Sequence, residues 1–167
     1  MTEEQKEYIE KNVDLITYNQ WEEFFNEAPR GIGEPLYIAE IDFMTKLGYV
    51  PRFAFSYCKS LTSIELPPSI THIDDEAFKD CYSLTNVTIP NNVIHIGRKA
   101  FLGCSNLTQV NIPASVISIG YKAFAWCSHL TSINFDGKID QWNEIKKVGA
   151  SDHDIVINCI DGQIVTE

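Results

Sequence analysis

Residues 77–122 read AFKDCYSLTNVTIPNNVIHIGRK and then AFLGCSNLTQVNIPASVISIGYK, so one pattern occurs twice with a period of 23 residues. The same pattern extends in both directions, from about residue 53 to residue 135. Each copy begins with Ala-Phe, has a cysteine three residues after the phenylalanine, and continues with Leu-Thr three residues later. A fixed period of roughly 20–50 residues indicates a solenoid, in which each copy is one structural unit stacked on the next.

Each copy predicts two short strands joined by turns. In LTNVTI, at 84–89, the last three residues alternate between apolar and polar, which indicates a strand that the following proline ends. Val93 and Ile96 predict a second short strand, and Gly97 allows a tight bend after it. We expect the next Ala-Phe-x-x-Cys segment to return the chain as a helical turn with its apolar side chains inside. The fold class predicted is therefore an α/β repeat, with short strands stacked into a parallel sheet and joined by helical turns.

The repeat also predicts where the stack begins and ends. Subtracting 23 pairs Val50 with Ile73, so a degenerate coil is expected to start near Ile41. The fourth copy breaks after Phe135, where Asp136 replaces the usual proline. The solenoid is therefore predicted over 41–135, as one degenerate, about three full and one partial coil.

Both flanks of the repeat are predicted to be caps, because an open end of a solenoid exposes apolar residues and strand edges. Residues 1–40 predict a helical N-terminal cap with helices over about 3–12, 19–28 and 35–40. Residues 136–167 predict a C-terminal cap, with a helix over about 141–148 that Asp140 caps. A β-hairpin of 154–159 and 163–166 follows it, and all three parts are expected to form one structural domain.

Composition narrows the classes of function. The 167 residues carry a formal net charge of -10, which disfavours nucleic acid because phosphates attract a basic surface. No run of eighteen apolar residues is present, so no membrane insertion is expected. The start, MTEEQKEYIEKN, lacks the cationic and apolar regions of a secretion signal. As written, the sequence predicts a cytoplasmic protein, with the cell surface or a virion as alternatives if another route exports it.

The repeat A-F-x-x-C-x-x-L-T-x-[IV]-x-[IL]-P-x-x-[IV]-x-x-I-[GD] resembles the BspA-like leucine-rich repeat of bacterial surface antigens. The resemblance covers residues 53–135, and the tail with Gln141, Trp142 and Cys159-Ile160-Asp161-Gly162 is similar to endings found behind such repeats. It implies a curved leucine-rich-repeat solenoid used for binding, often to host proteins or surfaces, with no catalytic residues to transfer. Small versions also resemble proteins of bacteriophages and mobile elements.

No motif for catalysis or for a cofactor is present. The sequence has no Gly-rich phosphate loop, no H-E-x-x-H and no G-x-S-x-G, so we predict no catalytic, cofactor-binding or metal-binding residue. The cysteines at 58, 81, 104 and 127 fall in one column and are expected to be buried, reduced and apolar in their role. Cys159 lies outside the column and is expected to be the more reactive thiol. His72 and His95 are expected on neighbouring exposed strand positions, as solvated side chains or, alternatively, as a metal pair or pH switch.

Two candidate binding surfaces follow from the repeat positions that should face solvent. The first is a polar, nearly uncharged strand face rich in hydroxyls and amides, chemistry that suits protein backbone or sugar hydroxyls. Its residues are Thr62, Thr85, Thr108, Thr131, Asn86, Gln109, Asn111 and Asn134. The second is apolar and comprises Leu102, Tyr121 and Trp126, although Trp126 could instead pack under the C-terminal cap.

The function predicted from these features is a non-enzymatic binding module, adhesin-like or scaffolding, that recognises a protein or a glycan. The alternative is a structural or receptor-binding component of a bacteriophage particle or larger assembly. The sequence leaves the ligand, the face that binds it and the oligomeric state open.

Overall fold

The structure is a computed structural model that describes residues 4, 7, 11, 44–147 and 149–165. The helices predicted over 19–28 and 35–40 lie outside the described residues, as does most of the predicted cap over 1–40. Within the helix predicted over 3–12, Glu4, Glu7 and Lys11 are described and helical, and Lys11 Nζ lies 2.7 Å from Glu7 Oε1.

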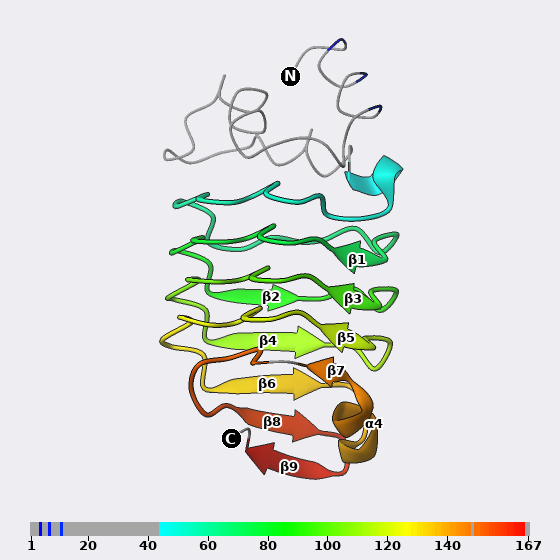
Figure 1. Ribbon diagram of the computed structural model, residues 1–167, viewed down its shortest axis with the longest axis vertical. Helices are drawn as coiled ribbons and strands as arrows, with labels where there is room; N and C mark the ends of the chain where they lie inside the picture. The colour runs from blue at the N-terminus through cyan, green and yellow to red at the C-terminus, as the bar shows by residue number, and fades with distance from the viewer. Residues whose placement is uncertain (1–3, 5–6, 8–10, 12–43, 148, 166–167) are drawn as a thin grey trace.

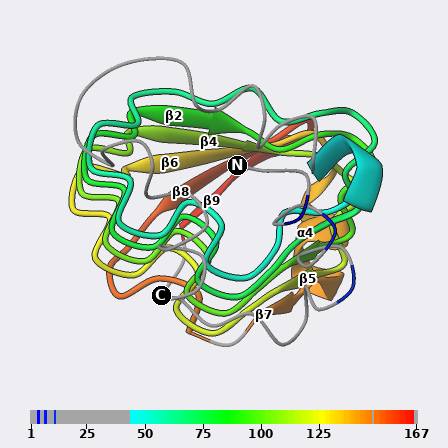
Figure 2. The ribbon, with the colours of Figure 1, turned by 90° about the horizontal axis from the view of Figure 1, so that it is seen from above.

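Short strands stack along the molecule in two sheets, and Figure 1 shows them on successive coils of a spiral. The narrow sheet has the order β1-β3-β5-β7, with β1 His72–Ile73, β3 His95–Ile96, β5 Ser118–Ile119 and β7 Lys146–Lys147. The wide sheet has the order β2-β4-β6-β8-β9, with β2 Asn86–Thr88, β4 Gln109–Ile112, β6 Ser132–Phe135, β8 Val156–Cys159 and β9 Gly162–Val165. Seen down the stack in Figure 2, the two sheets lie along different sides of each coil.

The register of the strands follows the sequence period. Asn86 pairs with Gln109 in the wide sheet, and His72 pairs with His95 in the narrow sheet, each 23 residues apart and in parallel orientation. Equivalent side chains therefore lie directly above one another. This confirms the predicted solenoid of stacked parallel strands.

A column of phenylalanines forms the centre of the core. Phe55, Phe78, Phe101 and Phe124 are each at most 1% exposed. Their rings stack with centroids 5.0, 5.0 and 5.4 Å apart and planes within 6° of parallel. Such stacking exists only between neighbouring coils, which is why one 23-residue unit cannot form this core by itself.

The cysteine column lies beside the phenylalanines, and its members are free thiols that are buried. These thiols also donate hydrogen bonds, so their role is not purely apolar as predicted. Cys81 Sγ donates to Phe55 O at 3.0 Å, and Cys104 and Cys127 repeat the bond one coil further on each time. Burial raises the pKa of the Cys81 and Cys127 thiols, so they stay protonated and able to donate.

The segment that returns the chain is a series of tight turns, so the predicted helical turns are wrong. Lys99 and Gly103 on one coil have φ of 54° and 75°, and the equivalent residues on the other coils also have positive φ. A right-handed helix does not tolerate such residues. The N–H groups of these residues donate to the next coil instead, as where Glu76 N–H donates to Arg98 O at 2.9 Å.

Gly97 and Gly120 allow the coils to approach closely at the bend. A Cβ at Gly97 would lie 2.5 Å from Asp74 C, and a Cβ at Gly120 would lie 2.5 Å from Arg98 N. Neither glycine has a positive φ. The bend therefore needs glycine for the space that the preceding coil leaves, and not for its conformational freedom.

The degenerate coil joins the stack at Val50, which is fully buried and forms a parallel bridge with Ile73. Before it, residues 44–47 are helical, although the sequence pairs them with the turn that precedes β1 in the next coil.

At the other end, residues 138–160 make one further turn of the spiral, which we call the closing coil. Helix α4, Ile139–Glu144, is shorter than the helix predicted over 141–148, because residues 146 and 147 form β7 on the narrow sheet. It begins before Asp140, which is therefore not its cap. Instead Gln141 Oε1 accepts the N–H of Lys138 at 2.8 Å. Strands β8 and β9 form an antiparallel hairpin in which Cys159 pairs with Gly162.

Candidate binding surfaces

Seven of the predicted polar residues lie on one face of the wide sheet or directly before its strands, and Thr62 lies on the coil before β2, where Thr85 N–H donates to its backbone oxygen at 3.1 Å. The four threonines, Asn86 and Gln109 are exposed, while Asn111 and Asn134 are half-buried. Parallel pairing aligns them in rows along the stack, so that Asn111, for example, pairs with Asn134. The structure thus brings the eight residues together as a continuous surface, which we call the polar face.

Threonine hydroxyls on this face bond to the preceding coil. Thr85 Oγ1 donates to Thr62 O at 3.2 Å, and Thr108 Oγ1 donates to Thr85 O at 3.1 Å. Each hydroxyl proton is then directed along the sheet and inward. Thr85 Oγ1 also accepts a bond from Asn86 Nδ2 at 3.3 Å, while Thr108 Oγ1 is exposed and its oxygen lone pairs can accept bonds from a ligand.

The amide side chains form a ladder across four strands. Asn134 Nδ2 donates to Asn111 Oδ1 at 3.0 Å, and Asn158 Nδ2 donates to Asn134 Oδ1 at 2.9 Å. Gln163 Nε2 continues the ladder with a 2.7 Å bond to Asn158 Oδ1. The repeat did not reveal Asn158 and Gln163 as part of the surface, because the period ends before them; the alternation in INC at 157–159 was the available signal.

Together these bonds fix the side chains before any ligand arrives. Each amide of the ladder makes one donor bond and has a second N–H that no described residue accepts; the donor bond of Asn111 goes to Thr88 Oγ1 at 3.3 Å. Because the side chains are already ordered, binding would cost less conformational entropy than on a flexible polar surface. Donors beside acceptors match groups that have both, such as sugar hydroxyls and peptide units.

The second predicted surface is only partly present, because Leu102 was placed wrongly. It is 4% exposed, and the equivalent Ser56 and Ala125 are fully buried. The prediction assumed a helical turn, on which this position would face outward. In the actual turn, Gly103 with its positive φ follows directly, and Leu102 is buried; Lys79, the equivalent residue one coil earlier, is half-buried.

Tyr121 and Trp126 do face solvent, with 43% and 62% of their surface exposed. The alternative that Trp126 packs under the cap is wrong. Its backbone N–H is nevertheless held by the closing coil, since Asp152 Oδ1 accepts it at 2.9 Å. Because Leu102 is buried, the two exposed rings do not form the three-residue apolar patch that was predicted.

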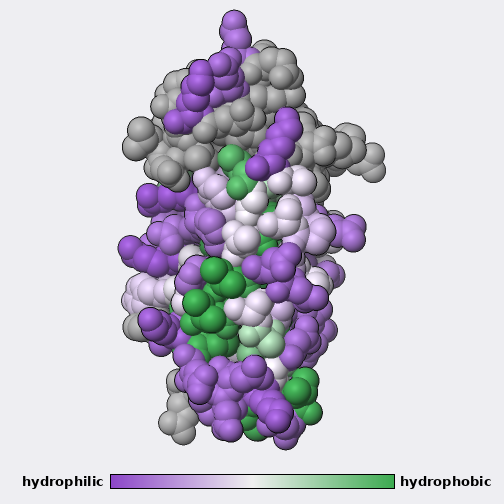
Figure 3. All heavy atoms as spheres, turned by 90° about the vertical axis from the view of Figure 1, so that its right-hand side faces the viewer, coloured by the Kyte–Doolittle hydropathy of each residue, from purple (hydrophilic) through white to green (hydrophobic). Residues whose placement is uncertain are grey.

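A different apolar patch lies beside the narrow sheet, and Figure 3 shows hydrophobic side chains gathered on that face. Ile94 and Ile117, which directly precede β3 and β5, are 39% and 56% exposed. Ile117 N–H donates to Ile94 O at 2.9 Å, so they are neighbours on successive coils. Strand alternation would have placed Ile94 on the same side as the buried Ile96, so it could not identify this pair. The available signal was the spacing of the inward residues Val93 and Ile96, which leaves the two positions between them outside.

The histidines of the narrow sheet align as predicted, with His95 opposite both His72 and Ser118. His95 Nδ1 lies 2.6 Å from Ser118 Oγ, and Tyr49 stacks on His72 at 4.6 Å. Among residues 44–147 and 149–165, no group of three or more His, Cys, Asp or Glu side chains is arranged to hold a metal ion.

None of the helices that the structure describes is long and apolar enough to cross a bilayer.

Comparison with solved structures identifies bacterial leucine-rich repeat proteins. The chain is similar to a leucine-rich repeat protein from Bacteroides ovatus ATCC 8483, with 30% identity, a TM-score of 0.53, and 65% of this chain and 27% of that chain covered. It is also similar to a leucine rich cell surface protein from Faecalibacterium prausnitzii A2-165, with 30% identity, a TM-score of 0.48, and 57% and 31% covered. The leucine rich repeat protein of T. pallidum has 33% identity, a TM-score of 0.47, and 50% and 42% covered.

This chain therefore spans less than half the length of each of these solved proteins. A comparison with curated proteins found no significant match. The family match and the Bacteroides ovatus structure give the phage alternative no support.

The family itself is settled by residues 35–145, which are 111 of the 167 residues and match the BspA type leucine rich repeat region in 6 copies. With the strand register and the phenylalanine column, the match shows that the chain belongs to the BspA-type leucine-rich repeat family.

Proposed function

We propose that this protein is a non-enzymatic recognition module that binds a protein or a glycan through the polar face. The amide ladder from Asn111 to Gln163 is the observation that carries the proposal. It presents ordered amide donors and acceptors on the same face as the exposed threonines, on a surface with almost no charge. The membership in a leucine-rich repeat family is consistent with a binding or scaffolding role.

A glycan array and a panel of purified surface proteins, followed by calorimetric titration of each hit, would test the proposal. The variant Asn86→Glu/Gln109→Glu adds two charges to exposed positions of the polar face. We expect it to raise the Kd of a true ligand at least tenfold, because two carboxylates replace groups that both donate and accept.

The matched control is Asn91→Glu/Ala114→Glu, which adds the same charge to exposed turns away from the polar face. It should leave the Kd unchanged. Equal weakening by both variants would show that the polar face is not the binding surface, and the lack of any saturable hit would contradict the proposal as a whole.

A further inference from the structure

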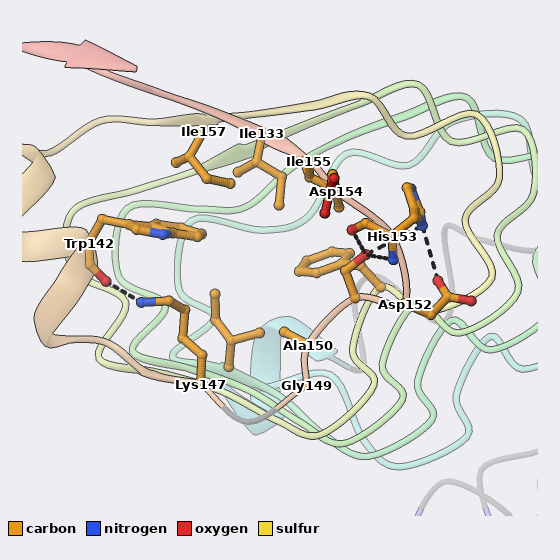
Figure 4. A pocket seen from close by; sticks show the side chains of 13 residues that line it. Ile133, Trp142, Lys147, Gly149, Ala150, Asp152, His153, Asp154, Ile155 and Ile157 are labelled. Atoms are coloured by element: carbon orange, nitrogen blue, oxygen red, sulfur yellow. Dashed lines mark hydrogen bonds and ion pairs between the residues drawn. The ribbon is translucent and has the colours of Figure 1, made fainter. Parts of the chain in front are cut away.

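A cavity of about 440 Å³ lies at the C-terminal end of the stack, between the last repeats and the closing coil (Figure 4). Ile119 of the last full repeat and Phe124 and Ile133 of the partial fourth copy line it, and each is at most 3% exposed. Trp142 and Ile157 of the closing coil line it as well and are equally buried. Core side chains therefore line one part of the cavity, and Lys147 with the partly or fully exposed residues 149–154 line the rest. Its volume falls within the roughly 300–1,000 Å³ of small-molecule pockets.

The cavity lies where the repeat would place its next phenylalanine. Within the stack, Phe101 N–H donates to Ala123 O, and the residue after that acceptor is Phe124. The same bond joins Phe124 N–H to Ala150 O at 2.7 Å, but the residue after this acceptor is Ser151. The ring stack consequently ends at Phe124, and a serine leaves the space below it without an aromatic ring.

A lysine points inward at the same level. Lys147 pairs with Ile119 across β5 and β7, so it occupies the inward position that isoleucine holds on the preceding coils. Its Nζ donates to Trp142 O and, at 3.4 Å, to Ile145 O. It also lies 4.9 Å from the centroid of the Trp142 ring.

This ammonium has no carboxylate partner in the described part of the chain, where the ion pairs involve other residues. Its partners among the described residues are two neutral carbonyl oxygens and the Trp142 ring, and burial lowers the pKa of Lys147 because the charged form is partly desolvated. An anion bound in the cavity would compensate it.

The acidic groups of the cavity are on the other side. In Figure 4, Lys147 and Trp142 lie at one end, and Asp152, His153 and Asp154 lie at the opposite end. Asp152 is already engaged, because it accepts the N–H of Trp126 and lies 3.0 Å from His153 Nδ1. A bound anion would thus be directed toward Lys147 and away from the aspartates.

We propose that this cavity binds a small aromatic carboxylate, whose ring continues the stack below Phe124 and whose carboxylate pairs with Lys147. The ring fits because the missing group is itself an aromatic ring, and the carboxylate fits because the ammonium lacks a counter-ion. The site is separate from the polar face, so its failure would leave the proposed recognition function untouched.

Isothermal titration of the full chain with phenylacetate tests the proposal, with phenylacetamide as the neutral analogue and cyclohexylacetate as the non-aromatic one. For a ligand of this size we expect a Kd of about 0.1–1 mM for phenylacetate. Both analogues should bind at least tenfold more weakly. Failure of phenylacetate to saturate, or equal affinity for all three compounds, would overturn the proposal.

Two variant pairs locate the site. Ser151→Phe should fill the cavity with the protein's own ring and abolish binding, whereas Ser151→Ala keeps the cavity and should leave the Kd within about twofold. Lys147→Met should weaken phenylacetate at least tenfold and leave phenylacetamide unchanged. If Ser151→Phe does not fold, the Lys147→Met comparison decides alone, and unchanged phenylacetate binding in that variant would refute the site.

Discussion

The backbone hydrogen bonds between coils continue from the repeats into the closing coil, as where Phe124 N–H donates to Ala150 O at 2.7 Å, but one of the backbone acceptors is replaced by a side chain. Within the repeats, Gly103 N–H donates to the backbone oxygen of Ala125 on the next coil. At the equivalent place in the last repeat, Trp126 N–H donates to the carboxylate of Asp152. The backbone pattern thus continues one coil further than the side-chain pattern, and the closing coil satisfies the last repeat without copying it.

The difference between the two regions lies in what fills the interior. The repeats place a phenylalanine, a cysteine and an isoleucine at fixed inward positions, and these are almost completely buried. The closing coil has Ser151 and Lys147 at two such positions, with a cavity between them. Hydrogen bonding can therefore end a solenoid while its core packing remains incomplete.

The strongest test of this comparison removes one ring from each region. Phe101→Ala should lower the free energy of unfolding by about 3–5 kcal/mol, because the ring is stacked on both sides. Phe124→Ala should cost about 1–2 kcal/mol less, since one side of its ring already borders the cavity. Urea unfolding of both variants measures the difference, and equal losses would mean that Phe124 is as tightly packed as Phe101.

Glycines of the two regions should also respond differently. Gly120→Ala should destabilise by about 1–3 kcal/mol, because its Cβ would meet the backbone of the preceding coil at 2.5 Å. At Gly149 of the closing coil the nearest atom is Tyr121 Cε2 at 3.4 Å, and the cost comes from its φ of 49°. We expect about 1 kcal/mol there. Thermal unfolding monitored by circular dichroism measures both variants, and a larger loss of stability for Gly149→Ala than for Gly120→Ala would contradict the prediction.

The cysteines give a smaller contrast. Cys104→Ala should cost about 1 kcal/mol by removing the bond to Phe78 O at 3.1 Å. Cys159→Ala should be nearly neutral, because this thiol is half-buried at the end of the stack. Iodoacetamide labelling of the native protein should modify Cys159 before the buried column. The reaction should still be slow at pH 7, because burial and Asp161 raise the pKa of Cys159. Labelling of the column at the same rate would show that the core opens readily.

The smallest expected effect is a pH dependence of the closing coil. Burial acts to lower the pKa of His153, but its bond to Leu130 O and its contact with Asp152 raise it overall. Protonated His153 therefore adds to the free energy of unfolding. This stabilisation is complete below about pH 6.5 and is lost as the pH rises through the raised pKa of His153. For Asp152, burial acts to raise the pKa, but the Trp126 and His153 bonds lower it overall. The stabilisation of the fold by ionised Asp152 is present above about pH 4 and is lost as the pH falls through the lowered pKa of Asp152.

Thermal unfolding between pH 5.5 and 8.5 measures the His153 part. The Tm of the wild type should fall relative to His153→Gln over this range by on the order of 1–2 °C, since both partners are partly exposed. His129→Gln serves as the control for loss of an exposed histidine outside the closing coil. A parallel pH profile for wild type and His153→Gln would exclude this contribution.

The burial of much of the repeat region could be predicted from the sequence, because each residue lies next to the equivalent residues of the two neighbouring coils. Phe78 and Cys81 recur every 23 residues in the same surroundings, so periodicity was sufficient to place them. The rows of the polar face followed for the same reason. Periodicity does not report local backbone conformation, however, and a short apolar segment fits a helical turn as well as a tight turn. Leu102 was misplaced on that account.

The closing coil could not be predicted because its residues act through contacts that no repeat specifies. Asn158 extends the amide ladder only because β8 adds to the wide sheet, and Lys147 faces inward only because β7 adds to the narrow one. Both strands were assigned differently or incompletely from local patterns. Their side chains acquire a role from a neighbour more than 20 residues away.

The constant register between coils has a consequence for how such a molecule changes in length. Because residue 86 meets residue 109 in the same way that residue 109 meets residue 132, duplication of any 23-residue segment between them would create another coil whose two faces match its neighbours. Recombination within the gene could thus extend or shorten the spiral in whole turns, while both terminal structures keep the partners they already have.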